Sequence, residues 1–207
     1  IGITESIAKV KDIGYMTENS FPQKTQEGRL PSIRINIPRT GRPDYALYFD
    51  DVAGESFDTR RENGESLIFM YNTTSIVFII DPLTSKFTSP GAKMKSWIKA
   101  NSNSIDASNK IEDLFSSVRT YLHEINRLHQ VILNFVLVKT DSGYLGNTIG
   151  NNEHEIKDFM VNELGLGSII SNNEFREQHF FAVTTVSKNK NIQNLCQCIL
   201  EQQHIEQ

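Results

Sequence analysis

Three short groups of acidic, glycine and hydroxyl residues each follow an apolar segment of the chain. The first group is DDVAGE at 50–55, of the form D-x-x-G. The second is VKTD at 138–141, of the form x-K-x-D, and the third is the threonine pair at 184–185. Each group taken alone is also compatible with an ordinary strand-to-loop turn, in which Asp, Gly and Thr are common.

The first group has the residue types that a metal-bound phosphate requires. Asp51 can reach a Mg²⁺ ion directly or through water, since carboxylate oxygens are preferred ligands of this cation. Gly54 lets its backbone N–H approach a phosphate without a side chain in the way. Glu55 can orient a water molecule. This spacing therefore predicts a phosphate and magnesium site.

The second and third groups suit recognition of a purine base. The Asp141 carboxylate can accept two parallel hydrogen bonds from guanine, a donor pair that adenine lacks, so adenine would be rejected. The stem of Lys139 can lie along the base plane. Thr184 and Thr185 suit a loop whose backbone N–H groups contact a base.

The apolar pattern predicts the elements that must position these groups. Continuous apolar runs at 75–81 and 131–139 predict strands buried on both faces of a sheet, and 179–187 predicts a third strand. Alternating segments at 32–38 and 45–51, joined by TGRPD, predict an antiparallel hairpin. Helical spacing is found at 3–13, 64–73, 93–100, 110–128, 155–164 and 191–203, with the helix at 155–164 stopped by Gly165.

This order of elements predicts an α/β fold with a doubly wound, mainly parallel sheet that includes one antiparallel hairpin strand. Ligands of such sheets bind outside the carboxyl ends of the strands. All three polar groups follow predicted strands directly. We therefore expect them to converge at one rim of the sheet.

The three motifs in this order resemble those of the Ras-like P-loop GTPases of the translation-factor-related class. The resemblance implies binding of GTP or GDP with Mg²⁺, with Asp51 and Gly54 at the metal and γ-phosphate positions. Glu55 stands where many members have a water-positioning Gln, and Thr184-Thr185 stands where Ser-Ala is usual. Thr25 is similar in position to the Thr of the first switch that binds Mg²⁺. The sequence IIDPL at 79–83, together with AGE at 53–55, resembles the bacterial double-GTPase group of conflict systems.

The chain departs from this family in two places. Val138 replaces the usual Asn or Thr, which lowers the expected affinity or specificity for the nucleotide. The sequence contains no G-x-x-x-x-G-K-[ST] phosphate-binding loop. We expect that loop around or before residue 1, so that this chain is a Ras-like GTPase fold that lacks the first strand and the P-loop. The chain alone is then expected to be inactive, with GTP hydrolysis in the intact protein.

Composition restricts the other functional classes. The 207 residues suit one domain, and the formal net charge of -4 argues against a general nucleic-acid or anionic-membrane binder. No apolar run is long enough to span a membrane and no signal peptide is recognisable, so we expect a cytoplasmic protein.

Residues 14–31 and 54–63 are the expected switch loops. These loops, or the long helical segment 82–130, are the expected surfaces for a protein partner.

Two alternatives remain open. A pseudo-GTPase would keep the fold as an interaction module without hydrolysis. A receiver-like phosphoacceptor domain would use Asp50, Asp51, Asp81 and Lys139 as its acidic and lysine cluster. A hydrolase with a side-chain nucleophile is poorly supported, because no G-x-S-x-G occurs and the histidines, His179 among them, show no partner at a useful spacing.

Overall fold

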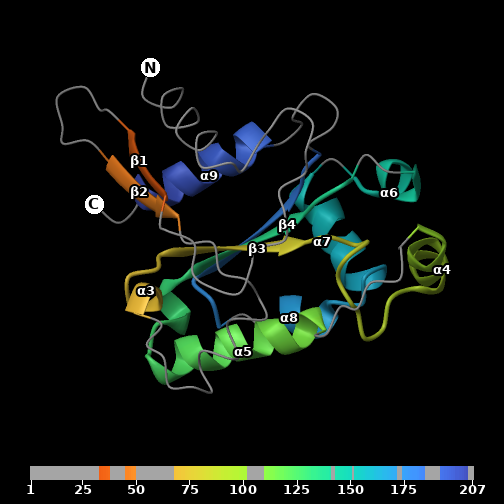
Figure 1. Cartoon of the computed structure of the whole chain (residues 1–207), viewed down its shortest axis with the longest axis horizontal. Helices are drawn as coiled ribbons and strands as arrows, with labels where there is room; N and C mark the ends of the chain where they lie inside the picture. The colour runs from red at the N-terminus through yellow and green to blue at the C-terminus, as the bar shows by residue number, and fades with distance from the viewer. Residues whose placement is uncertain are drawn as a thin grey trace. The chain divides into compact units, whose positions relative to one another are not determined.

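The structure is a computed structural model, and it describes residues 33–37, 45–49, 68–101, 110–140, 143–150, 152–171, 174–184 and 192–204 (Figure 1). The chain divides into two compact units, Ile1–Ser66 and Leu67–Gln207. The predicted helix 3–13 and the predicted switch loops 14–31 and 54–63 lie outside the described residues.

The N-terminal unit contains the hairpin that the alternating segments predict. Strand β1 (Ile33–Ile37) pairs with strand β2 (Tyr45–Phe49), and the pairing is antiparallel, with Ile33 opposite Phe49. The antiparallel hairpin is therefore confirmed. Two related expectations stay predictions: that one hairpin strand extends the parallel sheet, and that residues 1–207 form one domain.

The C-terminal unit is built on a parallel sheet of three strands in the order β3-β4-β5 (Figure 1). These strands are β3 (Ser75–Ile80), β4 (Ile132–Leu137) and β5 (Glu177–Ala182). Ile80 aligns with Leu137, which aligns with Ala182, so all three strands end at one rim. The helical elements of this unit are α3 (Ile68–Tyr71), α4 (Ala92–Asn101), α5 (Ile111–Glu124), η1 (Leu128–Gln130), α6 (Gly143–Thr148), α7 (Glu153–Asn162), α8 (Gly167–Ile170) and α9 (Ile192–His204).

Aromatic rings form the core between one face of the sheet and α5. Phe78, Phe135 and Phe180 occupy matching positions on the three strands and point to the same face. The Phe135 ring centroid lies 6.1 Å from that of Phe78 and 5.3 Å from that of Phe180. Phe115 of α5 packs on this row, 6.0 Å from Phe135. Phe115 is therefore a core residue.

The opposite face of the sheet is bonded to α9 through buried amides. Asn134 of β4 is fully buried and Gln202 of α9 is 4% exposed. Gln202 Nε2 donates to Asn134 Oδ1 at 3.0 Å, and Asn134 Nδ2 donates to Ser75 Oγ at 2.8 Å. Helices therefore cover both faces, as Figure 1 shows for α5 and α9. The predicted α/β class with a parallel sheet is confirmed for this unit.

This amide network predicts a measurable coupling between β4 and α9. Replacing Asn134 by Leu leaves the buried Gln202 amide without its main partner and should cost about 2–3 kcal/mol of unfolding free energy. Replacing Gln202 by Leu as well removes the unsatisfied group, so the double variant should be more stable than the sum of the single losses predicts. Urea denaturation of the four proteins measures this cycle. Strictly additive losses would show that the two amides do not interact energetically.

Strand β3 differs from the prediction that it is buried on both faces. Phe78 and Ile80 are buried, but Val77 and Ile79, which point to the other face, are 38% and 64% exposed. The apolar run at 75–80 is the same kind of pattern as the run of β4, whose six residues are all buried. A continuous apolar pattern predicts a strand but does not determine which neighbouring elements cover its two faces.

Helix α7 begins and ends with specific capping devices. Asn152 Oδ1 accepts a hydrogen bond from Glu155 N at 2.9 Å and the Glu155 carboxylate accepts one from Asn152 N, which forms a capping box. The predicted stop at Gly165 is confirmed, because this residue has a φ of 74° in the left-handed region. A Cβ atom there would lie 2.2 Å from the Ser89 carbonyl oxygen.

Gly165→Ala is therefore expected to lower the unfolding free energy by about 2 kcal/mol, because both its backbone conformation and the contact with Ser89 disfavour a side chain. Gly167→Ala is the matched control two residues away. A Cβ at Gly167 would lie 3.6 Å from Val161 Cγ1, an ordinary contact. Thermal or urea unfolding of both variants measures the difference. Equal stability of the two variants would contradict this account of Gly165.

Candidate functional site

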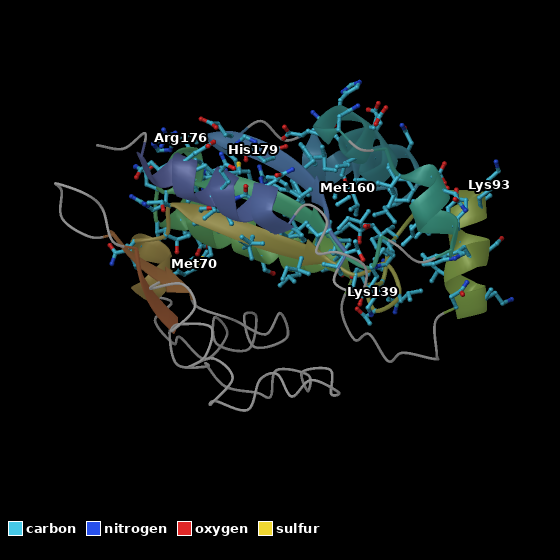
Figure 2. All side chains as sticks on the ribbon, turned by 90° about the horizontal axis from the view of Figure 1, so that it is seen from above. Met70, Lys93, Lys139, Met160, Arg176 and His179 are labelled. Atoms are coloured by element: carbon cyan, nitrogen blue, oxygen red, sulfur yellow. The ribbon has the colours of Figure 1, made fainter. Side chains whose placement is uncertain are left out.

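The carboxyl ends of β3, β4 and β5 bring polar residues to one rim of the sheet. Asp81 follows β3, Lys139 lies two residues after the end of β4, and Thr184 lies two residues after the end of β5. Figure 2 shows Lys139 at the end of the sheet opposite to Met70 and Arg176, which precede β3 and β5. This rim of an open parallel sheet is where ligands of α/β proteins bind.

Lys139 forms an ion pair with Asp81 across two neighbouring strands. Lys139 Nζ lies 2.5 Å from Asp81 Oδ2, and the two side chains are 44% and 17% exposed. Asp81 Oδ1 also accepts a hydrogen bond from Leu83 N at 3.0 Å. The carboxylate is therefore held on both oxygens, one by its own turn and one by the lysine.

The segments that follow β4 and β5 are bonded to each other. Val183 N donates to Leu137 O at 2.8 Å, and Thr140 Oγ1 donates to Val183 O at 3.2 Å. Val138 N donates to Ile80 O at 3.0 Å and so extends the β3–β4 pairing. Lys139 then turns out of the strand with a φ of 57°, an uncommon conformation for a residue with a side chain. These contacts align residues 138–140 of the x-K-x-D segment with residues 183–184, which follow β5.

Two of the predicted site residues fall within the described part of the chain. Lys139 is exposed after the end of β4, and Thr184 after the end of β5 is 5% exposed. The other predicted site residues lie outside the described residues, namely Thr25, Asp51, Gly54, Glu55, Asp141 and Thr185. Among the residues that are described, no group of three or more His, Cys, Asp or Glu side chains could hold a metal ion. The predicted magnesium ligands Asp51 and Thr25 are not part of that set.

The helix that follows the x-K-x-D segment is anchored by a tyrosine. Tyr144 of α6 donates from its hydroxyl to Glu163 Oε2 at 3.2 Å. Burial, and then the nearby Glu163 carboxylate, raise the pKa of the Tyr144 phenol. Glu163 O in turn accepts from Gly91 N at 2.8 Å, just before α4. This junction holds α6 against the segments at α4 and α7.

Sequence reasoning missed two pairings of charged residues. It used Asp81 in the IIDPL segment and in the receiver-like alternative, and it did not pair Asp81 with Lys139 in the nucleotide site. It also found no partner for His179, which in fact lies 3.3 Å from carboxylate oxygens of both Glu153 and Glu177. Glu177 is two residues before His179, a spacing that places both side chains on one face of β5 and was available from the strand pattern. Glu153 comes from α7 and had no sequence signal.

The fold thus defines an open parallel α/β sheet with a polar carboxyl rim. Comparisons with protein-family models, with curated proteins and with solved structures gave no match to this chain. In the part of the chain that the structure describes, none of the helices has the length and apolar character needed to cross a membrane.

Proposed function

We propose that this chain is the guanine-nucleotide-binding part of a GTP-hydrolysing molecular switch. The observation that best supports this function is the alignment of two independently predicted segments at one rim. Residues 138–140 of the x-K-x-D segment and residues 183–184 extend neighbouring parallel strands and are joined by the hydrogen bond from Thr140 Oγ1 to Val183 O at 3.2 Å. A purine bound at this rim can contact both.

The base-recognition role follows from the chemistry of this segment. Lys139 offers its methylene stem to the base plane, and Asp141 accepts hydrogen bonds from the two guanine donors. Thr184 and Thr185 supply backbone N–H groups to the base. Val138 has no side-chain amide or hydroxyl to tie the segment to a phosphate-binding loop, so the affinity should be below that of a protein with Asn or Thr there.

The phosphate role is proposed for residues of the D-x-x-G segment and the first switch. Asp51 and Thr25 would hold Mg²⁺, which neutralises charge on the phosphates during phosphoryl transfer. Gly54 would donate its N–H to the γ-phosphate. Glu55 would orient the attacking water poorly, because its negative charge is repelled by the phosphate, so slow turnover is expected.

Binding of guanine nucleotides by the full-length protein tests this function. Fluorescent GDP is titrated with Mg²⁺ present and displaced by unlabelled GDP, GTP, ADP or ATP. Displacement by the guanine nucleotides, with adenine nucleotides weaker by about 100-fold or more, is expected. Equal displacement by ADP, or no binding, would overturn the proposal. Guanine binding without phosphate release would instead identify a pseudo-GTPase.

A receiver-like phosphoacceptor is the second proposed function, because Asp81 and Lys139 are in contact at the rim. Phosphorylation of Asp81 by acetyl phosphate, detected by mass spectrometry, would support this alternative and remove the GTPase proposal.

The segment 82–130 remains the proposed surface for a protein partner. Its helix α4 exposes Lys93, Lys95 and Lys99 and has no acidic residue, as AKMKSWIKAN shows. Figure 2 shows Lys93 on the outer part of this helix. An acidic protein surface would complement these lysines.

A further inference from the structure

Lys139 has a backbone conformation that its own side chain does not favour. Its φ of 57° lies in the left-handed region, where residues other than glycine are uncommon. Such conformations persist when surrounding contacts over-determine them, and they concentrate at ligand sites. The contacts that hold this residue are therefore of interest for the function of the rim.

Asp81 provides a charged contact for the Lys139 side chain. Its Oδ2 atom lies 2.5 Å from Lys139 Nζ. The carboxylate cannot easily turn away, because its Oδ1 atom accepts from Leu83 N at 3.0 Å. The Asp81 carbonyl oxygen accepts from Thr84 N and Ser85 N at 3.1 and 2.8 Å, which closes the turn that carries the carboxylate.

The two residues are brought together by the strand register. Ile80 aligns with Leu137, and Val138 N donates to Ile80 O at 3.0 Å. Asp81 is the first residue after the end of β3, and Lys139 is the second residue after the end of β4. The ion pair therefore draws the lysine stem from the end of β4 towards the end of β3, along the rim rather than away from it.

We infer that Asp81 is a positioning residue for guanine-nucleotide binding, an inference that rests on the proposed function. Asp81 does not contact the nucleotide. It holds the Lys139 ammonium group so that the methylene stem is extended across the rim before the base arrives. An ion pair that is partly exposed contributes little to folding stability, so the effect of Asp81 should be seen in ligand affinity.

A double-mutant cycle on the full-length protein tests this role. Asp81→Asn keeps an oxygen that can accept from Leu83 N but removes the negative charge. Lys139→Met keeps a similar stem without the ammonium group. Fluorescent GDP binding is measured for both single variants and for the double variant. Glu174→Gln is the matched control, because it removes another ion pair, in which Arg119 Nη2 lies 2.6 Å from Glu174 Oε2. Glu174 lies before the amino end of β5.

Asp81→Asn should weaken GDP binding by about 5- to 10-fold, because the charge-assisted contact that orders the lysine is lost. In the Lys139→Met background the same change should have an effect within about twofold, because Asp81 acts through Lys139. Glu174→Gln should leave binding unchanged, and thermal unfolding should show that all variants are folded.

The outcomes separate the two proposals. If the unmutated protein binds GDP but Asp81→Asn weakens binding equally in both backgrounds, or has no effect, the positioning role is wrong and the proposed function survives. If the unmutated protein does not bind guanine nucleotides, the proposed function and the positioning role are both wrong.

Discussion

Asp141→Asn is expected to change the nucleotide preference of the full-length protein from GTP to xanthosine triphosphate. The Asp141 carboxylate is expected to accept hydrogen bonds from the N1–H and the exocyclic amine of guanine. Asparagine presents an N–H donor in place of one acceptor, which leaves a guanine donor unpaired. Xanthine has a carbonyl oxygen where guanine has the amine, and it can accept from that donor. We expect GTP affinity to fall by about 100-fold or more.

Competition binding measures this exchange. Each triphosphate displaces a fluorescent nucleotide from the unmutated protein and from the Asp141→Asn variant. Asp158→Asn is the control, because Asp158 is an exposed aspartate on α7 whose neighbour is His154 at 3.3 Å. The control should keep the preference for GTP. An Asp141→Asn variant with an unchanged ratio of GTP to xanthosine triphosphate affinity would contradict the role of Asp141 in base recognition.

Phe135→Ala is expected to give the largest loss of stability among the substitutions considered, about 3–5 kcal/mol of unfolding free energy. Phe135 is fully buried at the centre of β4, and its ring contacts Phe78, Phe115 and Phe180. Truncation removes these contacts from the middle of the core and leaves a cavity that the strands on either side cannot readily fill.

Urea denaturation of the full chain measures this loss. Phe135→Leu retains part of the volume and should lose less stability, which provides a folded variant if the alanine variant does not fold. Tyr71→Ala is the surface control, since Tyr71 is 51% exposed and should change stability by less than about 0.5 kcal/mol. A loss for Phe135→Ala as small as that for Tyr71→Ala would show that the aromatic row is not the core of this unit.

The strands and helices of the C-terminal unit were largely predictable, because their signals are local. The run at 131–139 contains only apolar residues and Asn134 before Lys139, and β4 is buried throughout. Helix α7 ends before Gly165, as the conformational freedom of glycine predicts. The start of α7 was predicted at 155 rather than at Glu153, because the capping box at Asn152 was not recognised. Helix α6 was missed, because its sequence GYLGNT is short and contains two glycines.

The candidate site was predictable only where strand ends determine it. Lys139 and Thr184 could be placed at one rim, because parallel strands end on the same side of a sheet. The partner of Lys139 could not be chosen in this way. Asp50, Asp51, Asp81 and Asp141 all lie at or near predicted strand ends and offer the same carboxylate, and motif spacing does not rank them.

The sequence by itself determined the α/β class, the antiparallel hairpin, the parallel strands and the placement of Lys139 and Thr184 after the carboxyl ends of neighbouring strands, because residue periodicity and strand direction are local properties. The tertiary structure alone decided that Asp81 pairs with Lys139, that Gln202 bonds Asn134 and that Val77 and Ile79 are exposed. These features depend on strand register and on the helix that covers each face. Both are set by contacts between residues far apart in the chain, which no local pattern encodes.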